Sequence, residues 1–344
     1  MKKILPVCLL ALLLCAACAP ASVAVSAPAV SDAPAAAAAP TPAPTALPTP
    51  SPTPAATPFS MVWLSDTQNY TSTYPEILTA MTDWIALQRD TENIRLLLHS
   101  GDMLQNCLNT DQQARFTEAF SRLPADLPVF TAGGNHDRGN APHYFRAFAQ
   151  YRPDSPIAPE QISPDGTCRY QTFTAGGVQF LLLSVSYLGE TANAEWLRDA
   201  LAAHPDHYGI LLTHAYMQEL CDQYNDGFIS SGRILMRDVI VPSPNLRLVL
   251  CGHMYGMLRR TTELDDNGDG TPDRTVNQIL INPQDDVNGG NGYLSLLRFD
   301  PVDDSITLRV YSPFAGDEIG NLSGFETAPY RMENAGLSSY KTTP

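Results

Sequence analysis

Residues 129–137 read Val-Phe-Thr-Ala-Gly-Gly-Asn-His-Asp, a short apolar run that ends in two glycines and a cluster of polar side chains. Such a run is typical of a buried β-strand, and the glycines allow a sharp turn after it. Four other apolar runs end in the same way, each in a carboxylate or an imidazole. They are residues 61–64 before Ser65-Asp66-Thr67-Gln68, 94–98 before Gly101-Asp102, 210–212 before Thr213-His214, and 246–250 before Cys251-Gly252-His253.

Helical patterns separate several of these strands, at residues 75–89, 111–123 and 193–203. The alternation of strands and helices predicts βαβ units with largely parallel strands. In open α/β sheets, ligands bind at the carboxyl ends of the strands. We therefore expect the polar clusters to converge in space.

The converging side chains would be carboxylate and amide oxygens together with neutral imidazoles. This mixture suits Mn, Fe, Zn or Mg. A single polar residue at a strand end is more often a hydrogen-bonded core residue than a ligand. Five clusters in the same position make coincidence a poor explanation, so the sequence predicts a metal centre.

Taken in order, the clusters resemble the motifs of the calcineurin-like metallophosphoesterase superfamily, which run DxH, GD, GNHD/E, H and GHxH. A later segment, Gly289-Gly290-Asn291-Gly292-Tyr293-Leu294, is similar to exported bacterial members. The resemblance covers about residues 59–314 and implies an α/β fold, a four-layer α/β/β/α sandwich of two mixed sheets flanked by helices. The matching residues are Asp66-x-Gln68, Gly101-Asp102, Gly133-Gly134-Asn135-His136-Asp137, His214 and Gly252-His253.

The resemblance also implies a reaction, the hydrolysis of phosphomonoesters or phosphodiesters by a hydroxide bound to two divalent metal ions. His136 would lie beside the scissile phosphate and either donate a proton to the leaving group or stabilise charge, and Asp137 would orient His136 through its other ring nitrogen. Two cation positions are implied: a first position formed by Asp66, Gln68 and Asp102, and a second position formed by Asp102, Asn135, His214 and His253.

Two residues depart from the family pattern. Gln68 replaces the usual histidine, and its amide oxygen holds a hard cation more weakly than imidazole holds a borderline one. Tyr255 stands where GHxH has its second histidine. We expect a weak, exchangeable first position. Tyr255 could instead ligate a ferric ion as a phenolate, or pack its ring and hydrogen-bond its hydroxyl.

These departures leave a rival interpretation, a catalytically silent binding protein on the same fold that has lost the first position. Arg138, Asn106 and Tyr255 are candidate substrate contacts near the motifs, or else solvated loop residues. His99, inside an apolar run, is predicted to be a hydrogen-bonded strand residue rather than a ligand.

Residues 265–273 read Asp-Asp-Asn-Gly-Asp-Gly-Thr-Pro-Asp between two strand-like runs, 258–264 and 275–281, as expected for the tip of a hairpin. Alternating oxygens with a glycine at the sixth position match the first half of an EF-hand calcium loop, but the glutamate of the twelfth position is absent. Two interpretations remain, a plain acidic turn or a calcium site formed by Asp265, Asn267, Asp269 and Asp273.

The N-terminal residues 1–18 have two lysines, a short apolar run and small residues, the pattern of a secretion signal. Cys15-Ala16-Ala17-Cys18 resembles a bacterial lipobox, with Cys18 as the acylated residue. Residues 19–58 are rich in Ala, Pro, Ser and Thr and should form a semi-rigid spacer. We expect an exported, lipid-anchored, extracytoplasmic protein with its catalytic domain at 59–314 and a C-terminal tail at 315–344.

The chain is acidic, with 36 Asp+Glu against 21 Lys+Arg and a formal net charge of −15. Such a charge repels polyanions, so nucleic acid is not an expected partner, whereas a small phosphoester and the membrane are. Cys107, Cys168, Cys221 and Cys251 have long, irregular separations that predict no disulfide framework. The late apolar runs 276–283, 292–300 and 305–313 are expected to form the second sheet, followed by an irregular tail.

Overall fold

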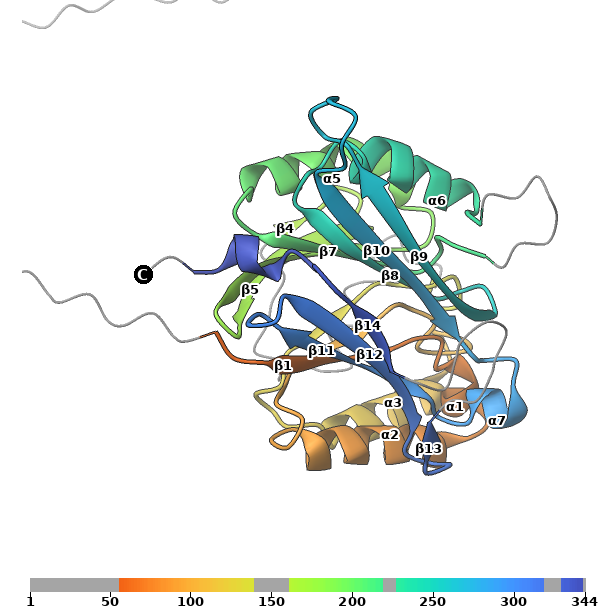
Figure 1. Cartoon of the computed structure of the whole chain (residues 1–344). Coiled ribbons are helices and arrows are strands. Elements are labelled where there is room, and N and C mark those ends of the chain that lie inside the picture. Colours follow the sequence, from red (N-terminus) through yellow and green to blue (C-terminus); the bar gives the residue numbers. More distant parts are fainter. Residues whose placement is uncertain (1–55, 139–160, 219–226, 319–328, 343–344) are drawn as a thin grey trace, which may run out of the picture. The chain divides into compact units, whose positions relative to one another are not determined.

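The computed structural model describes residues 56–138, 161–218, 227–318 and 329–342. Within these residues the chain forms two mixed β-sheets of seven strands each, with helices on their outer faces (Figure 1). The predicted four-layer α/β/β/α sandwich is thus confirmed. The expected signal segment with Cys18, nearly all of the spacer and Cys221 lie outside the described residues.

The first sheet places the earliest strand of the domain in its middle. β1 is parallel to β2, β2 is parallel to β3, and β11 is antiparallel to β1, with Met61 opposite Leu297. In spatial order the strands are β13 (Asp317–Glu318), β12 (Ser305–Ser312), β11 (Leu294–Asp300), β1 (Phe59–Leu64), β2 (Ile94–His99) and β3 (Val129–Thr131), with β14 (Tyr330–Met332) also paired to β12.

The second sheet has a parallel centre and an antiparallel hairpin at each end. In spatial order its strands are β4 (Gln161–Ile162), β5 (Cys168–Ala175), β6 (Val178–Val185), β7 (Tyr208–Thr213), β8 (Leu246–Cys251), β10 (Arg274–Asn282) and β9 (Gly256–Leu264). The β9–β10 hairpin confirms the turn predicted at 265–273. The β5–β6 hairpin was not predicted.

The three predicted helices are confirmed within a few residues. The Asn109 side chain begins the second of them by accepting hydrogen bonds from the backbone N–H groups of Asp111 and Gln112. α1 (Gln68–Ser72), α2 (Pro75–Gln88) and α3 (Thr110–Ser121) lie beside the first sheet, and α5 (Glu190–Ala203), α6 (Ser230–Leu235) and the π-helix η1 (Met236–Ile240) beside the second (Figure 1). Two short elements are α7 (Val287–Gly290) and the 3₁₀-helix η2 (Leu337–Tyr340).

The core explains why the strands read as continuous apolar runs. Met61 and Trp63 of β1 belong to the cluster between the sheets, whereas Val62 and Leu64 belong to the cluster against α2 and α3. Successive side chains of a strand point to opposite faces, so β1 buries both faces. Because β1 is buried on both faces, residues that follow it closely, such as Asp66, are also buried.

The expected placement of the late strands is wrong in part. β10 joins the second sheet, but β11 and β12 return to the first and cover the open side of β1. The apolar pattern predicts a strand, but it does not say which strand will be its neighbour.

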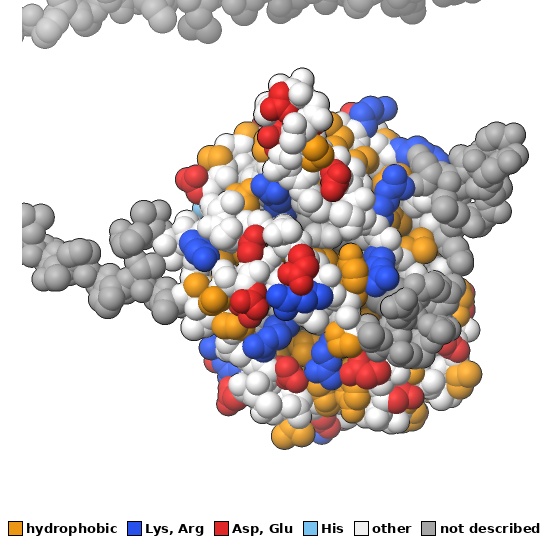
Figure 2. Space-filling view, viewed as in Figure 1, with side chains coloured by type: hydrophobic (Ala, Val, Ile, Leu, Met, Phe, Trp, Pro, Cys, Tyr) orange, Lys and Arg blue, Asp and Glu red, His pale blue; other side chains and the backbone are white. Residues whose placement is uncertain are grey.

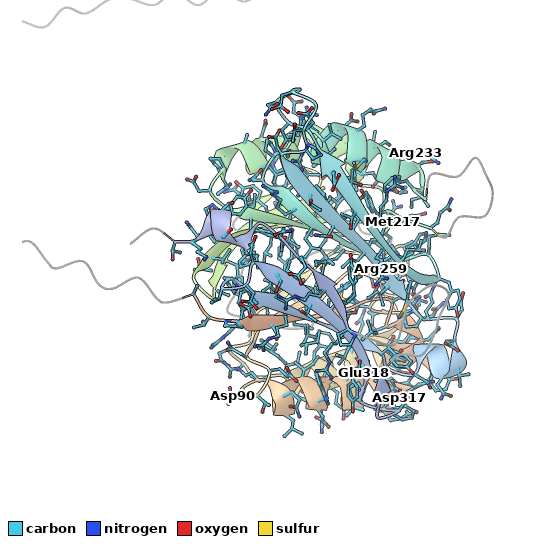
Figure 3. The ribbon with its side chains drawn as sticks, viewed as in Figure 1. Asp90, Met217, Arg233, Arg259, Asp317 and Glu318 are labelled. Atoms are coloured by element: carbon cyan, nitrogen blue, oxygen red, sulfur yellow. The ribbon has the colours of Figure 1, made fainter. Side chains whose placement is uncertain are left out.

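The residues after Pro313, expected to be irregular, supply β13, β14 and η2. The guanidinium of Arg259, on β9, lies over the ring of Tyr330, on β14, with its central carbon 4.2 Å from the ring centroid. Arg259 is labelled in Figure 3. The backbone of Lys341 forms an isolated antiparallel β-bridge with that of Val178 in β6. The C-terminal segment therefore contacts both sheets.

Among the described residues, none of the helices is long and apolar enough to cross a bilayer. Cys107, Cys168 and Cys251 are unpaired.

Candidate metal centre

Five loops, each following a strand, meet at one edge of the two sheets, as the sequence predicted. The His253 N–H donates to Asp66, the His136 N–H to Asp102, and the His214 ring contacts both Asn135 and His253. Three of these residues adopt left-handed backbone conformations, with φ of 52° at Asp66, 54° at Asp102 and 69° at His253. Such angles are strained for residues other than glycine and often occur at functional sites.

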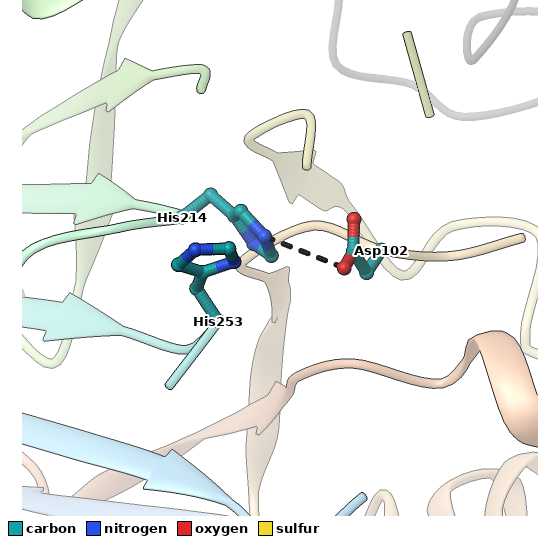
Figure 4. Close-up of side chains that lie close together, drawn as sticks. All are labelled: Asp102, His214 and His253. Carbon is teal, nitrogen blue, oxygen red and sulfur yellow. Dashed lines mark ion pairs between the residues drawn. The ribbon is translucent and has the colours of Figure 1, made fainter. Parts of the chain in front are cut away.

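The second position is the more complete of the two. Asp102, His214 and His253 each offer a ligand atom, and these atoms lie within 4.8 Å of one another (Figure 4). The Nε2 atom of His214 lies 3.4 Å from Asp102 Oδ2 and 3.0 Å from Asn135 Oδ1. All four residues predicted for this position are therefore together.

The His214 ring is oriented by its other nitrogen. Nδ1 lies 3.0 Å from the carbonyl oxygen of Ser100 and donates to it, which leaves Nε2 facing two oxygens. Burial opposes a charged ring, but the charge and hydrogen bond of Asp102, together with Asp66 and the Ser100 carbonyl group, outweigh burial and raise the pKa of His214 to about 9. Burial likewise opposes ionisation of Asp102, but His214 holds the pKa of Asp102 below its ordinary value. His214 Nε2, Asp102 Oδ2 and Asn135 Oδ1 can all act as acceptors and face one another, so they need either a proton or a cation between them. These residues therefore fit a metal ion.

The first position consists of oxygen atoms. Asp66 is 2% exposed and accepts hydrogen bonds from the Ser65 hydroxyl and, at 3.1 and 3.2 Å, from the His253 N–H. Burial, reinforced by Asp102 and opposed by His214, raises the pKa of Asp66 to about 7. A buried carboxyl group with a raised pKa is the kind of group that a nearby cation would ionise.

Gln68 fits the same position through its oxygen. Its amide nitrogen donates to the Oε1 atom of Gln284, in the loop after β10. Its own Oε1 atom is buried and has no hydrogen-bond partner among the described residues. An unpaired buried acceptor is costly unless a ligand satisfies it, and a hard cation would do so.

Two glycines allow the loops to approach the carboxylates. A Cβ atom on Gly134 would lie 2.0 Å from Asp102 Oδ1, and one on Gly252 would lie 2.1 Å from Asp66 Oδ2. No side chain fits at those distances. The glycines of GGNHD and CGH therefore serve the packing of loops against ligands, beyond the sharp turns predicted from the sequence.

The predicted role of Asp137 is wrong. Its carboxylate accepts the backbone N–H groups of Met103, Leu104 and Gly134 at 3.0, 3.3 and 2.8 Å, and so fastens two loops together. The Nδ1 atom of His136 lies instead 3.0 Å from the carbonyl oxygen of Gln105. A carbonyl group, not a carboxylate, orients the half-buried His136 ring.

The candidate substrate contacts do not enter the buried cluster. Tyr255 is 39% exposed, and Arg138 is exposed. Asn106 is also exposed and caps its own loop by accepting the Leu108 N–H. His99 is buried and hydrogen-bonds to Thr67 Oγ1 and the Gly101 N–H, as predicted for a structural strand residue.

The acidic turn at 265–273 lies at the tip of the β9–β10 hairpin, where acidic side chains project at the top of Figure 2. Its carboxylates accept backbone N–H groups of the same turn. Asp265 accepts from Gly268 and Gly270, and Asp273 accepts from Asp266 and Asn267. The turn is thus closed by its own hydrogen bonds, and calcium binding stays a prediction.

Two residues beside the centre were not predicted from the sequence. Tyr187, in the loop after β6, packs its ring 5.2 Å from that of His253 and 5.9 Å from that of His214. Gln284 reaches Gln68 from a loop 216 residues away in sequence. Neither lies in a motif, although Tyr187 follows an apolar run that could have been recognised as a sixth strand.

Comparison with known proteins supports the geometry. A sequence profile described as calcineurin-like phosphoesterase matches residues 59–257. The uncharacterized protein YvnB of Bacillus subtilis (strain 168) is 32% identical over 265 residues, which is 76% of this chain and 20% of YvnB. The chain therefore spans about a fifth of the length of this curated relative.

Among solved structures, the purple acid phosphatase PPD1 from yellow lupin (Lupinus luteus) seeds has a TM-score of 0.52 at 14% identity, covering 86% of this chain and 57% of PPD1. Sulfate thiohydrolase SoxB of Thermus thermophilus has a TM-score of 0.44 at 11% identity, covering 86% of this chain and 59% of SoxB. At its identity the likeness to the lupin enzyme concerns the fold alone.

Proposed function

Because the chain belongs to the calcineurin-like phosphoesterase family, we propose that it hydrolyses small phosphomonoesters or phosphodiesters outside the cytoplasm with a pair of divalent cations. The observation that carries this proposal is the His214 ring nitrogen, which faces oxygens of Asp102 and Asn135 beside the His253 ring. When bound, the cations would neutralise phosphoryl charge and acidify water.

The residues of the chain hold and orient the reacting groups. Asp102 is fixed at both oxygens, since Oδ1 accepts the His136 N–H at 2.9 Å and Oδ2 faces His214. This geometry suits a carboxylate that bridges the two positions. Asn135 and His253 would complete the second position, and Asp66 and Gln68 the first.

His136 is the candidate proton donor. With Nδ1 donating to Gln105, the ring presents Nε2 as its remaining proton-transfer atom. The ring is half-buried and its backbone is tied to Asp102, so it lies at the rim of the centre. A donor in this position can protonate the leaving oxygen while the substrate phosphoryl group stays between the ligands.

The substrate class follows from charge. A strongly acidic protein repels long polyanions, whereas a local pair of cations attracts a single phosphoryl group. The basic start, apolar run and Cys18 motif of residues 1–18 support export and a lipid anchor, with residues 19–58 as a spacer. The substrates would then be small phosphoesters outside the cell membrane.

The test is hydrolysis of an aryl phosphomonoester and an aryl phosphodiester by the full chain with added Mn²⁺, Fe²⁺, Zn²⁺ or Mg²⁺. Asp102→Asn keeps the size of the side chain but removes the bridging charge, and should abolish turnover. Asp303→Asn, whose side chain is 59% exposed at a distant turn, is the matched control and should keep it.

The rival interpretation, a catalytically silent binding protein, rests on Gln68 and Tyr255. A wild type that binds a single cation and hydrolyses neither ester with any of the metals would favour it. Metal-dependent turnover that Asp102→Asn removes would exclude it.

A further inference from the structure

A chain of hydrogen bonds that begins in the core ends on the Asp66 carboxylate. The Trp63 indole N–H donates to the Ser100 hydroxyl at 3.0 Å, and the Ser100 hydroxyl donates to that of Ser65 at 2.7 Å. The Ser65 hydroxyl in turn donates to Asp66 Oδ2. Trp63 is 1% exposed and Ser100 is fully buried, so water does not compete for these two groups, and Ser65 is half-buried.

The chain can run in only one direction. An indole N–H is a donor only, so the Ser100 oxygen must accept from it. Each hydroxyl has one proton, and the alternative acceptor for Ser100, the Leu64 carbonyl oxygen, is farther away at 3.5 Å. That carbonyl already accepts the Ser100 N–H at 3.0 Å. When Asp66 is ionised, as a cation ligand must be, it can only accept, so the last proton of the chain then points at Asp66.

Ser100 also contacts the second position. Its carbonyl oxygen accepts the Nδ1–H of His214 at 3.0 Å, which orients the ring nitrogen toward Asp102. The side chain of Ser100 thus serves a residue of the first position, and its backbone serves a residue of the second. A carboxylate that ligates a metal is commonly oriented by such partners.

We propose that Trp63, Ser100 and Ser65 are positioning residues that aim the Asp66 carboxylate and set the affinity of the first cation position. The proposal rests on the proposed function, since it takes the two positions as cation sites. It explains how the chain keeps a first position despite Gln68, the weaker ligand. Gly252 supports it, because a Cβ atom there would lie 2.0 Å from Ser65 Oγ.

The experiment is a titration of the full chain with Mn²⁺, followed by electron paramagnetic resonance. A single bound ion gives an isolated signal, and filling of both positions gives a spin-coupled signal. Ser65→Ala should require about tenfold more Mn²⁺ for the coupled signal, with the isolated signal unchanged, because losing a ligand's orienting partner typically weakens metal affinity by 10–100-fold. Ser60→Ala is the matched control, since Ser60 is buried in β1, the strand that Ser65 follows, and its hydroxyl has no partner among the described residues.

Trp63→Phe removes only the start of the chain and should give a smaller shift in the same direction. Trp84→Phe, on α2, is its control and should give none. Ser65→Ala and Trp63→Phe proteins that form the coupled signal at the wild-type Mn²⁺ concentration would overturn this proposal alone. A wild type that never binds a second Mn²⁺ would overturn the proposed function and this proposal with it.

Discussion

The two proposed cation positions differ in the sheet that supplies most of their ligands and in the atoms they offer. The second position takes two imidazoles, His214 and His253, from the loops after β7 and β8. The first would take Asp66, from the loop after β1, and Gln68, the first residue of α1, and would offer only oxygens. Asp102, from the loop after β2, would be shared.

This difference shows two ways to build a cation site. Imidazole is a strong ligand for borderline metals, so the second position depends on ligand identity. Carboxylate and amide oxygens hold such metals less tightly, so the first position depends on how well its ligands are aimed. The hydrogen bonds to Asp66 from Ser65 and to Gln284 from Gln68 provide that aim.

The largest effect should come from the second position. His214→Ala removes a ligand outright, so Mn²⁺ affinity and kcat/KM should fall by more than about 100-fold, beyond the 10–100-fold typical of orienting partners. Metal content by elemental analysis and turnover of an aryl phosphate measure this. His204→Ala, at the end of α5, is the control; a His214→Ala protein that keeps both ions would contradict the assignment.

A pair of glycine substitutions separates the positions by steric means. Gly252→Ala would push against Asp66 and should lose the first ion while keeping the second, a loss of roughly 100-fold at one position. Gly134→Ala would push against the shared Asp102 and should lose both. Equal metal content in the two variants would mean that the carboxylates do not divide the ligands as proposed.

Changing the ligand itself tests the weakness of the first position. Gln68→His restores an imidazole and should raise Zn²⁺ affinity at the first position by about tenfold, since imidazole suits zinc better than an amide oxygen does. Competition between Zn²⁺ and Mg²⁺, followed by calorimetry, measures the preference. If Zn²⁺ binding is unchanged, Gln68 does not face the ion.

The smallest effect should come from the partner of Gln68. Gln284→Leu removes the acceptor that fixes the amide, so the oxygen turns toward the ion only part of the time. First-position affinity should fall a few-fold, at the low end of the range for orienting partners. Gln88→Leu, at the end of α2, is the matched control. A Gln284→Leu protein with wild-type Mn²⁺ affinity would show that the amide is aimed by other contacts.

The strand ends and their polar clusters could be predicted because both signals are local. An apolar run predicts a buried strand, and the residues that follow it are next in the sequence, as at Gly101-Asp102. Convergence then follows from the common edge of parallel strands, and the contacts of His214 with Asp102 and of the His253 N–H with Asp66 confirm it.

What could not be predicted depends on distant neighbours. Asp137 follows His136 in a motif, yet its partners are backbone N–H groups of Met103 and Leu104 on another loop. Gln284 lies outside every motif. The return of β11 to the first sheet is of the same kind, because apolar alternation does not encode a partner strand. The roles assigned to the ligands stay predictions until metal is measured.

The central place of β1 has a consequence for the order in which the domain assembles. Its neighbour on one side, β2, follows soon after in the sequence, but its neighbour on the other side, β11, begins only at Leu294. Pairing across so long a stretch of chain is slow and cannot precede synthesis of the later strand. For a chain exported as proposed, the sandwich would close only after Leu294 and the rest of β11 have crossed the membrane.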